Sequence, residues 1–408
     1  MEFFMIVFKI LEILLLAYLG GSSLYILLFA LAGLFKGRDP IHPHTRTRFI
    51  TIIIPAYGED SVIVETISNS LIQNYPETSF HVILVADSFK SETVEILKKF
   101  PITLVEISLN ISTKVKSLQK ALELLPHETE VVLILDADNL MGPDMLQKLN
   151  NVFETGIEVV QCHRLAKNTN TSYALLDAIS EEINNHIFRK GHAALGLSPA
   201  LIGSAMAFST SIFRSYIPRL EAIGGFDKEL ELLLQKDEVP IWYLDDALVL
   251  DEKIQNAKVF YKQRKRWIYS QFFYFGTDFL KSIWLLPSKG NIQYFNKALQ
   301  FSLPPRIVTL GLLFTINVIY LFFPISTLQV LWMIALVACI TAIFTSIPFR
   351  FYSLKSLKAL ISLPKIFFIM IFILLRLRGA NKQFIHTEHE FINNPDQPLK
   401  NNKYENRD

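Results

Sequence analysis

The sequence has few of the residues that build disulfide scaffolds and zinc modules. It contains two cysteines, Cys162 and Cys339, in 408 residues, and no Cys-x-x-Cys pair or Cys/His cluster. It also lacks an excess of one charge, since 40 Lys and Arg stand against 38 Asp and Glu, for a net charge of +2. The cysteine count excludes a disulfide framework and a zinc site. The balanced charge gives no reason to expect nucleic acid as a partner.

Apolar residues, in contrast, are abundant. They make up 51% of the chain, which is high for a soluble enzyme, while the 19% of charged residues is too many for a chain made only of membrane spans. This composition indicates membrane segments attached to a water-soluble domain. The length allows two or three domain-sized units.

Three apolar stretches predict the membrane segments. The charge-free run 13–35 is long enough to cross the hydrocarbon core, and we expect an N-terminal anchor there, not a cleaved signal peptide. The charge-free run 307–349 predicts a transmembrane hairpin that turns at Pro324. The stretch 359–375 is interrupted by a Pro-Lys pair, which favours an interfacial helix on the cytoplasmic face over a fourth span.

Basic residues beside these runs predict their orientation. Lys36, Arg38, Arg46 and Arg48 follow the first run, and positive residues collect on the cytoplasmic side. A hairpin starting there returns the chain to the same side, where Arg350 lies. We therefore expect an integral protein of a bacterial-type plasma or inner membrane whose soluble middle domain is cytoplasmic.

The predicted organisation has six parts. They are an anchor over 1–36, a cytosolic domain over 45–270, interfacial helices over 271–306, a transmembrane hairpin over 307–349, an interfacial or fourth transmembrane helix over 350–380, and a polar tail over 381–408.

The soluble middle alternates short apolar runs with amphipathic stretches. The runs 49–55, 80–86, 102–107, 131–135 and 158–161 predict strands, and 61–74, 92–100 and 114–125 predict helices between them. This order predicts an α/β fold with a mostly parallel central sheet covered on both faces. In such sheets ligands bind at the carboxyl ends of the strands, so polar residues there are candidates for function.

Asp136 and Asp138 directly follow the predicted strand 131–135. Side chains two residues apart on a strand point to the same face, so both carboxylates can meet at one place. Two such acids repel each other unless a cation lies between them or one is protonated. Mg²⁺ bridges carboxylates to substrate phosphates, so this pair predicts a metal and diphosphate site.

Two other predicted strands also end in polar residues. Pro55 is expected to stop the first strand, and Tyr57 and Glu59 follow it. Glu59 and Asp60 suit either a binding role or a cap on the next helix. Asp87 ends the second strand and suits either a hydrogen bond from a base or ribose, or an ordinary turn.

Near the end of the soluble region, Gln263-Arg264-Lys265-Arg266-Trp267 combines cations, an amide and an indole. Arginine matches phosphate oxygens with two hydrogen bonds, and an indole face suits the apolar side of a sugar ring. The alternative is a basic helix at the membrane surface, with Trp267 as an interface anchor.

These motifs together resemble the membrane-bound family 2 glycosyltransferases, which include the cellulose, hyaluronan, chitin and poly-N-acetylglucosamine synthases. The resemblance runs from about Phe49 to Trp267. Its most specific part is the Gln-x-x-Arg-Trp pattern downstream of Asp-x-Asp. It implies a GT-A fold (nucleotide-diphospho-sugar transferase), a nucleotide-sugar donor that is usually a UDP-sugar, and Mg²⁺ or Mn²⁺ as cofactor.

The resemblance also implies roles for the matching residues. They are nucleotide binding for Pro55, Tyr57, Glu59, Asp87, Asp136 and either Lys114 or Lys116; metal binding for Asp138; general base catalysis for Asp227; and contact with diphosphate or acceptor for Ser204, Gln263, Arg264, Arg266 and Trp267.

Three positions depart from the family's usual pattern. Gly58 stands where Asn is usual, Ala86 replaces the first of two aspartates, and Gly225-Phe226 precedes Asp227 where Thr-Glu is common. Because of the last departure, Glu229, Asp251 and Glu252 are alternatives for the general base.

The function implied is an inverting, metal-dependent transfer of a sugar to a hydroxyl of a membrane-associated glycan or lipid, in polysaccharide or glycolipid biosynthesis. The expected partners are the nucleotide-sugar, the acceptor, the lipid bilayer and export or synthase subunits. The alternative is a catalytically inactive membrane subunit of a polysaccharide synthesis or export complex.

Overall fold

The computed structural model describes residues 2–35, 43–108, 112–323 and 326–377. The chain divides into two compact units. The sheet unit takes in Pro40–Ala174 and Leu201–Ile254, and the helical unit takes in Met1–Asp39, Leu175–Ala200 and Gln255–Ala380. The helical unit thus contains residues 175–200 and 255–270, which the sequence analysis grouped with the cytosolic domain. Lys36, Arg38, Pro324 and the tail 381–408 lie outside the described residues.

The sheet unit is built on one eight-stranded sheet with the order β3-β2-β1-β4-β7-β6-β8-β5. Its strands are β1 (Ile50–Tyr57), β2 (Phe80–Asp87), β3 (Thr103–Ile107), β4 (Val131–Ile134), β5 (Leu140–Met141), β6 (Val159–Ala166), β7 (Met206–Ser209) and β8 (Trp242–Asp251). The first four in that spatial order are parallel to one another, and β6 is parallel to β8. β7 runs antiparallel to β4 and β6, and β5 antiparallel to β8. All five predicted strands are confirmed, as is the mostly parallel sheet.

Apolar side chains on both faces of the central strands explain why helices cover the sheet on two sides. Ile52 and Ile54 belong to one buried cluster, while Ile53 between them belongs to the other. The first face is covered by α2 (Ile63–Leu71), α3 (Ser91–Leu97) and α5 (Met145–Phe153). The second is covered by α4 (Lys114–Glu123), α8 (Thr210–Tyr216) and α9 (Phe226–Lys236). A strand buried on both faces reads as a continuous apolar run, which is why these strands were visible in the sequence.

One local prediction near β1 was wrong. Pro55 does not stop the strand, because β1 continues to Tyr57 and Pro55 pairs with Val85. The missing N–H of Pro55 points to the side where β4 has already ended, so no ladder hydrogen bond is lost. Of the two acids considered as caps of α2, Asp60 accepts a hydrogen bond from the backbone N–H of Lys90, and the N-cap residue of α2 is Val62.

The sequence did not predict β5, β7 or β8. β8 carries Asp245 and Asp246 in its middle, and aspartate is depleted in strands. These residues occupy a register shift: Leu244 pairs with Cys162 and Leu248 with His163, so that three residues of β8 have no opposite partner. Because of this irregularity β8 was not predicted, although its last residue, Asp251, lies in the functional site.

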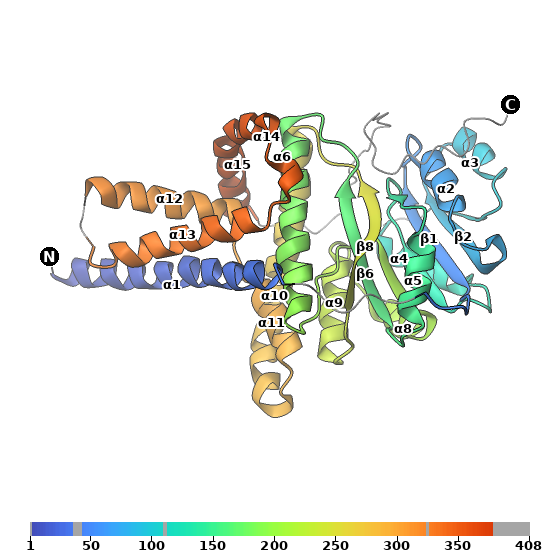
Figure 1. Ribbon diagram of the computed structural model, residues 1–408, viewed down its shortest axis with the longest axis horizontal. Helices are drawn as coiled ribbons and strands as arrows, with labels where there is room; N and C mark the ends of the chain where they lie inside the picture. Colours follow the sequence, from blue (N-terminus) through green and yellow to red (C-terminus); the bar gives the residue numbers. More distant parts are fainter. Residues whose placement is uncertain (1, 36–42, 109–111, 324–325, 378–408) are drawn as a thin grey trace. The chain divides into compact units, whose positions relative to one another are not determined.

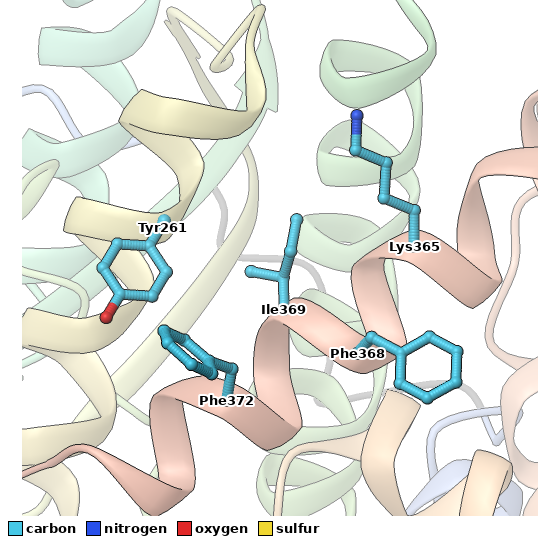
Figure 2. A pocket seen from close by; sticks show the side chains of 5 residues that line it. All are labelled: Tyr261, Lys365, Phe368, Ile369 and Phe372. Atoms are coloured by element: carbon cyan, nitrogen blue, oxygen red, sulfur yellow. The ribbon is translucent and has the colours of Figure 1, made fainter.

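The helical unit contains α1 (Glu2–Ala32), α6 (Ser172–Asn184), a π-helical segment (Asn185–Gly191), α7 (His192–Ala194), α10 (Ala257–Lys289), α11 (Ile292–Gln300), α12 (Arg306–Phe322), α13 (Gln329–Thr345), α14 (Leu354–Ala359) and α15 (Leu363–Leu375). In Figure 1, α1, α12 and α13 run side by side, while α6 stands roughly at right angles to them at one end. Leu19, Leu313 and Trp332 are buried where α1, α12 and α13 pack together. Figure 2 shows the side chains that line an open apolar hollow of about 580 Å³ between α10 and α15: Tyr261, Lys365, Phe368, Ile369 and Phe372.

Two helical segments are long and apolar enough to cross a membrane, judged by length and composition: Glu2–Ala32 and Leu354–Leu375, which joins α14 to α15. The predicted hairpin is present as α12 and α13, but each is only 17 residues long. α1 also starts earlier than the predicted span, so that Glu12 lies within the helix. Its Oε1 atom accepts hydrogen bonds from the Tyr320 hydroxyl (2.6 Å) and the Trp332 indole (3.1 Å).

Candidate active site

The predicted acid pair lies directly after β4, at the carboxyl end of the central strand. Asp138 is buried, with 3% of its surface exposed, whereas about a third of the Asp136 side chain is exposed. Backbone contacts hold both residues: the Asp136 N–H donates to Ser204 Oγ (2.8 Å), and the Glu252 N–H donates to Asp138 Oδ2 (3.0 Å). The turn is therefore tied to the segments that follow it in the sheet.

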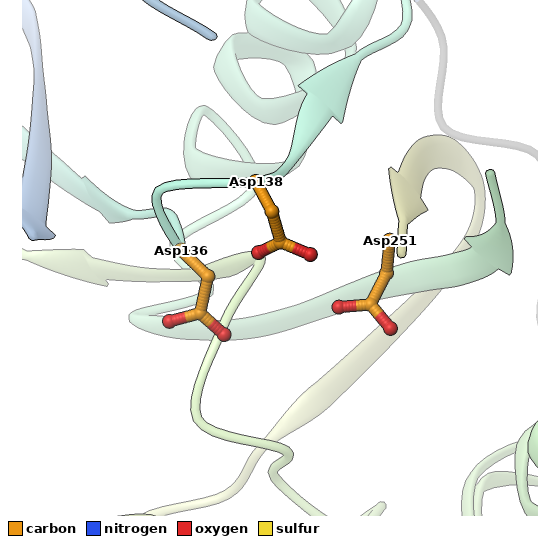
Figure 3. Close-up of side chains that lie close together, drawn as sticks. All are labelled: Asp136, Asp138 and Asp251. Carbon is orange, nitrogen blue, oxygen red and sulfur yellow. The ribbon is translucent and has the colours of Figure 1, made fainter. Parts of the chain in front are cut away.

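A third carboxylate joins this pair. Asp251, at the end of β8, offers an oxygen that lies within 4.8 Å of oxygens from Asp136 and Asp138. Figure 3 shows the three side chains converging from two different chain segments. The prediction that Asp136 and Asp138 meet at one place is confirmed, and Asp251 enlarges the pair to an acidic triad.

Cations surround the triad. Lys253 Nζ lies 2.7 Å from Asp251 Oδ2, Arg164 Nη1 lies 3.5 Å from Asp251 Oδ1, and the Lys114 amine forms an ion pair with Asp136. These charges offset the repulsion among three acids at one place. The carboxylate oxygens that remain suit a hard cation, and Mg²⁺ and Mn²⁺ both prefer such ligands.

Lys114 and Lys116, the two lysines considered for nucleotide binding, have different contacts. Its amine contacts Asp136 and also donates to the Gly203 carbonyl oxygen, at 2.7 Å. Lys116 is exposed, and its backbone N–H bonds to Thr113, the N-cap of α4. Only Lys114 thus lies beside the acids.

Asp227 lies next to Gly203, the residue whose carbonyl oxygen accepts the Lys114 amine. It occupies the first turn of α9, which begins after Gly225 in a left-handed conformation with φ of 73°. A Cβ added to Gly203, itself at φ of 80°, would meet the Cβ of Asp227 at 3.8 Å. The Gly203 carbonyl oxygen accepts a hydrogen bond from the Lys114 amine, which pairs with Asp136. Gly203 and Lys114 therefore connect Asp227 to the acidic triad.

The alternatives for the general base have different contacts. The Glu229 carboxylate accepts the backbone N–H groups of Glu221 (3.2 Å) and Ala222 (3.0 Å), which fastens the loop before α9. Asp251 is paired with Lys253, as Asp227 is with Lys228 (3.4 Å), and it belongs to the acidic triad. The backbone N–H of Glu252 donates to Asp138, a contact that leaves the Glu252 carboxylate as an alternative base.

The residues expected to bind the nucleotide cluster at the ends of β1 and β2. Tyr57 and Asp87 are opposite each other in the parallel register. Asp87 is 1% exposed; its Oδ1 accepts the Ser88 hydroxyl (2.9 Å), while its Oδ2 is buried with no hydrogen-bond partner in the described part of the chain. Gly58 has φ of 60°, a conformation that asparagine also tolerates, so this departure from the family pattern keeps the backbone geometry available.

Ser204 is not exposed beside the turn that carries Asp136 and Asp138 but is buried and supports that turn. Its hydroxyl is fully buried and bonds to Asn139 Oδ1. The Asn139 amide in turn reaches Asp138 Oδ1 and Asp251 Oδ1, both at 3.2 Å. Asn139 thus links two members of the triad, a role that its place right after the Asp-x-Asp motif did not reveal.

The Gln-x-x-Arg-Trp residues lie on α10, in the helical unit. Arg264 forms a buried ion pair with Asp177, and its guanidinium lies 4.5 Å from the Trp267 ring centre and 5.1 Å from that of Phe260. The Gln263 Oε1 atom is buried and has no hydrogen-bond partner among residues that the structure describes. Arg264 therefore holds Trp267 in place, and Asp177 is a supporting residue that the sequence did not indicate.

A family comparison agrees with this geometry. The model of the family described as glycosyltransferase like family 2 matches residues 47–270, more than half of the chain. The chain belongs to this family. It is a glycosyltransferase, and its α/β sheet unit has the GT-A-like fold that the resemblance implied.

Individual relatives are distant. Poly(ribitol-phosphate) beta-N-acetylglucosaminyltransferase TarS of Staphylococcus aureus is 25% identical over 99 residues, and the match covers 24% of this chain and only 17% of TarS. A mannosyltransferase structure from Pyrobaculum calidifontis, in complex with GDP-Man and Mn²⁺, has a TM-score of 0.48 and 18% identity, covering 82% of this chain and 97% of that one. S. aureus TarS 1–349 has a TM-score of 0.38 and 16% identity, covering 78% and 90%.

Proposed function

We propose that this family 2 glycosyltransferase transfers a sugar from a nucleotide-sugar to a hydroxyl of a membrane-associated glycan or lipid, with inversion at the anomeric carbon. The donor that we propose is a UDP-sugar. The observation that carries the proposal is the acidic triad of Asp136, Asp138 and Asp251 at the carboxyl end of the sheet, with Lys114 paired to Asp136. Asp227 lies next to Gly203, whose carbonyl oxygen accepts the Lys114 amine.

The triad is the place for the metal. Asp138 and Asp136 would hold Mg²⁺ or Mn²⁺ through carboxylate oxygens, with Asp251 as the third acid. Such an ion would supply positive charge to stabilise the departing diphosphate. Lys114 adds a positive charge beside Asp136, and the family resemblance assigns Arg266 to the diphosphate as well.

Asp227 acts as the general base. A sugar hydroxyl is a poor nucleophile, so a carboxylate must take its proton as the new bond forms. Asp227 is only 17% exposed; its carboxylate lies 3.4 Å from the Lys228 amine, whereas the Glu229 carboxylate accepts backbone N–H groups of a loop. Attack from the face opposite the diphosphate then inverts the configuration in one step, and no covalent intermediate is required.

The nucleotide occupies the ends of β1 and β2. The buried Asp87 Oδ2 offers an acceptor for a base N–H or a ribose hydroxyl. Tyr57 supplies a ring face for the base, and Glu59, which is 7% exposed, lies in the same turn. The family resemblance assigns Gln263 and Trp267 to diphosphate and acceptor binding; within the helical unit, Arg264 contacts the Trp267 indole and pairs with Asp177.

Apolar segments support attachment to a membrane. Glu2–Ala32 and Leu354–Leu375 have the length and composition of spans, and Arg46 and Arg48 follow the first of them. The positive-inside rule then places the sheet unit on the cytoplasmic side of a bacterial-type plasma or inner membrane. An inactive subunit of an export complex has less support, because the acids and the Gln-x-x-Arg-Trp residues are all retained.

The test is release of the nucleoside diphosphate by purified full-length protein in detergent, screened over nucleotide-sugars with Mg²⁺, with Mn²⁺ and with a chelator. We expect release only with metal, and loss of release in Asp138→Asn. Asp246→Asn is the matched control, because this acid lies on β8 as Asp251 does but its side chain is 60% exposed and pairs with Lys148. A wild-type protein that turns over no donor would refute the proposal and leave the inactive subunit.

A further inference from the structure

A fully buried glutamine, Gln161 on β6, lies next to the loop of residues 202–205 that leads into β7. Its side chain points to the same face of the sheet as Val159, which belongs to the apolar cluster covered by α4, α8 and α9. A buried amide without hydrogen bonds is costly, so a glutamine in such a place needs partners inside the protein. The partners that it has are in the loop.

The amide of Gln161 binds the backbone of this loop at three points. Its Oε1 atom accepts the Ile202 N–H (3.0 Å), and its Nε2 atom donates to the carbonyl oxygens of Ser204 and Ala205, both at 3.1 Å. The carbonyl oxygen of Cys162 lies 3.0 Å from the same nitrogen. A reversed amide would place its oxygen against three carbonyl oxygens, so the donors and acceptors match only in this orientation.

The loop needs this support because its backbone is strained. Ala205 has φ of 52°, in the left-handed region that residues with a side chain rarely adopt. Such a conformation persists only where the surrounding structure offsets its cost. Two hydrogen bonds, from the Gln161 amide and from the Cys162 N–H (2.8 Å), end on the carbonyl oxygen of Ala205. The glutamine therefore holds the loop at its strained residue.

The same loop supports the active site. The Ser204 hydroxyl accepts the Asp136 N–H (2.8 Å) and bonds to Asn139, the residue that links the other two members of the acidic triad. The Gly203 carbonyl oxygen accepts the Lys114 amine (2.7 Å). A shift of the loop would therefore move the acids and the lysine together.

We propose that Gln161 is a positioning residue for the metal and diphosphate site. It acts through Ser204 and Gly203, by holding the loop in the strained conformation that places the acidic triad and Lys114. The effect on metal binding rests on the proposed function, which the inference deepens, whereas the coupling between loop and acids can be measured without metal or donor.

Hydrogen exchange in the full-length protein in detergent measures this coupling. Gln161→Met keeps the length of the side chain but removes its amide. We expect exchange in peptides covering 201–206 to become about tenfold faster, as for the loss of one hydrogen bond, and exchange in peptides covering 136–139 to accelerate with it. The second effect is expected because the Asp136 N–H is held by Ser204. Acceleration confined to 201–206, or none at all, would overturn the proposal.

A milder variant covers the case in which Gln161→Met does not fold. Gln161→Asn keeps an amide but shortens its reach by one methylene group, and it should accelerate exchange in both segments by about threefold. Unchanged exchange at 136–139 in this variant, with faster exchange at 201–206, would also overturn the proposal.

Thr51→Val is the matched control. Thr51 is likewise 0% exposed in a strand of the same sheet, but its hydroxyl bonds to that of Thr129 (2.8 Å) near the amino end of β1. The control should lower Tm without faster exchange at 136–139. Equal acceleration of that segment in the control and in Gln161→Met would reflect a general loss of stability and overturn the proposal.

Ala205→Gly tests the strain. Glycine adopts positive φ without steric cost, so the loop should depend less on the glutamine. In the double variant of Gln161→Met and Ala205→Gly, exchange at 136–139 should return to within about threefold of the wild-type rate. A double variant that exchanges as fast as Gln161→Met would overturn the claim that the glutamine holds a strained loop.

Metal dependence distinguishes this inference from the proposed function. In the release assay, Gln161→Met should raise the Mn²⁺ concentration for half-maximal release about tenfold, while kcat at saturating Mn²⁺ falls less than about threefold. An unchanged Mn²⁺ dependence would overturn the role of Gln161 in the metal site and leave the glycosyltransferase proposal standing. Absence of release with every donor in the wild type would overturn the proposed function, and hydrogen exchange would still decide whether Gln161 couples the loop to the acids.

Discussion

The two acids in the first turn of α9 provide a sharp test of the catalytic assignment. Asp227 and Glu229 are two residues apart, and both were candidates for the general base. The structure gives them different surroundings: Glu229 accepts two backbone N–H groups of the preceding loop, while Asp227 lies beside Gly203 and the Lys114 amine contact. We therefore expect different defects from the two variants: a loss of turnover in Asp227→Asn and a loss of stability in Glu229→Gln.

The expected magnitudes follow from those contacts. Removal of a general base lowers turnover by about 10²–10⁴-fold, which is about 2.7–5.5 kcal/mol in activation free energy. Asp227→Asn should do this with little change in donor affinity, because the amide keeps the size of the side chain. Glu229→Gln replaces a charged acceptor of two hydrogen bonds by a neutral one, which should cost about 1 kcal/mol of stability and lower Tm by about 2–4 °C.

The assay measures three quantities on each purified variant: kcat from release of the nucleoside diphosphate, donor Kd from calorimetry, and Tm from thermal unfolding. A large fall in kcat with unchanged Kd and Tm is expected for Asp227→Asn. For Glu229→Gln, a lower Tm with kcat within about threefold of the wild type is expected. Full activity of Asp227→Asn, or an equal loss of kcat in both variants, would remove Asp227 from the proposed mechanism.

Three further predictions concern the helical unit. Gly311→Ala places a Cβ 2.4 Å from the Phe367 ring and should cost about 1–3 kcal/mol in a thermal melt, whereas Gly276→Ala, with no atom within 4 Å of its added Cβ, should cost nothing. Glu12→Ala leaves Tyr320 and Trp332 without their acceptor and should lower stability by about 1–3 kcal/mol, with Glu12→Gln closer to the wild type. Burial lowers the pKa of His192 to about 3 from 6.5, so the folded protein keeps it neutral. Below about pH 6.5 the unfolded chain binds the proton and stability should fall by up to about 1.4 kcal/mol per pH unit, a slope that His192→Gln should reduce in pH-dependent unfolding.

The parts of the fold that the sequence predicted are those where burial alone determines the pattern. β1, β2 and β4 are apolar on both sides, so their runs are continuous and hard to mistake. β8 was missed because its two central aspartates occupy the register shift opposite Cys162 and His163. Pro55 was wrongly expected to end β1 for a similar reason. Whether a proline ends a strand depends on the neighbouring strand, and that neighbour is distant in sequence.

The candidate site shows the same division. Asp136 and Asp138 were predicted to lie together because they follow a buried strand. β4 ends at Ile134, however, so the turn after the strand, and not the period of two along it, brings the two carboxylates together. Asp251 is separated from them by more than a hundred residues, and only the pairing of β8 with β6 brings it to the triad. Arg264 was expected at the diphosphate because its type suits phosphate, but the sequence could not show that Asp177, on another helix, already balances its charge.

The short hairpin has a consequence for the lipid that suits this protein. At about 1.5 Å per residue, the 17 residues of α12 or α13 extend about 25 Å, less than the roughly 30 Å of an average hydrocarbon core, whereas the 31 residues of α1 extend about 46 Å. If the hairpin crosses a bilayer together with α1, as the sequence predicts, the bilayer must become thinner at the hairpin while α1 tilts. Lipids with short acyl chains relieve this mismatch, so reconstitution should yield a more stable enzyme in thin bilayers than in thick, sterol-rich ones.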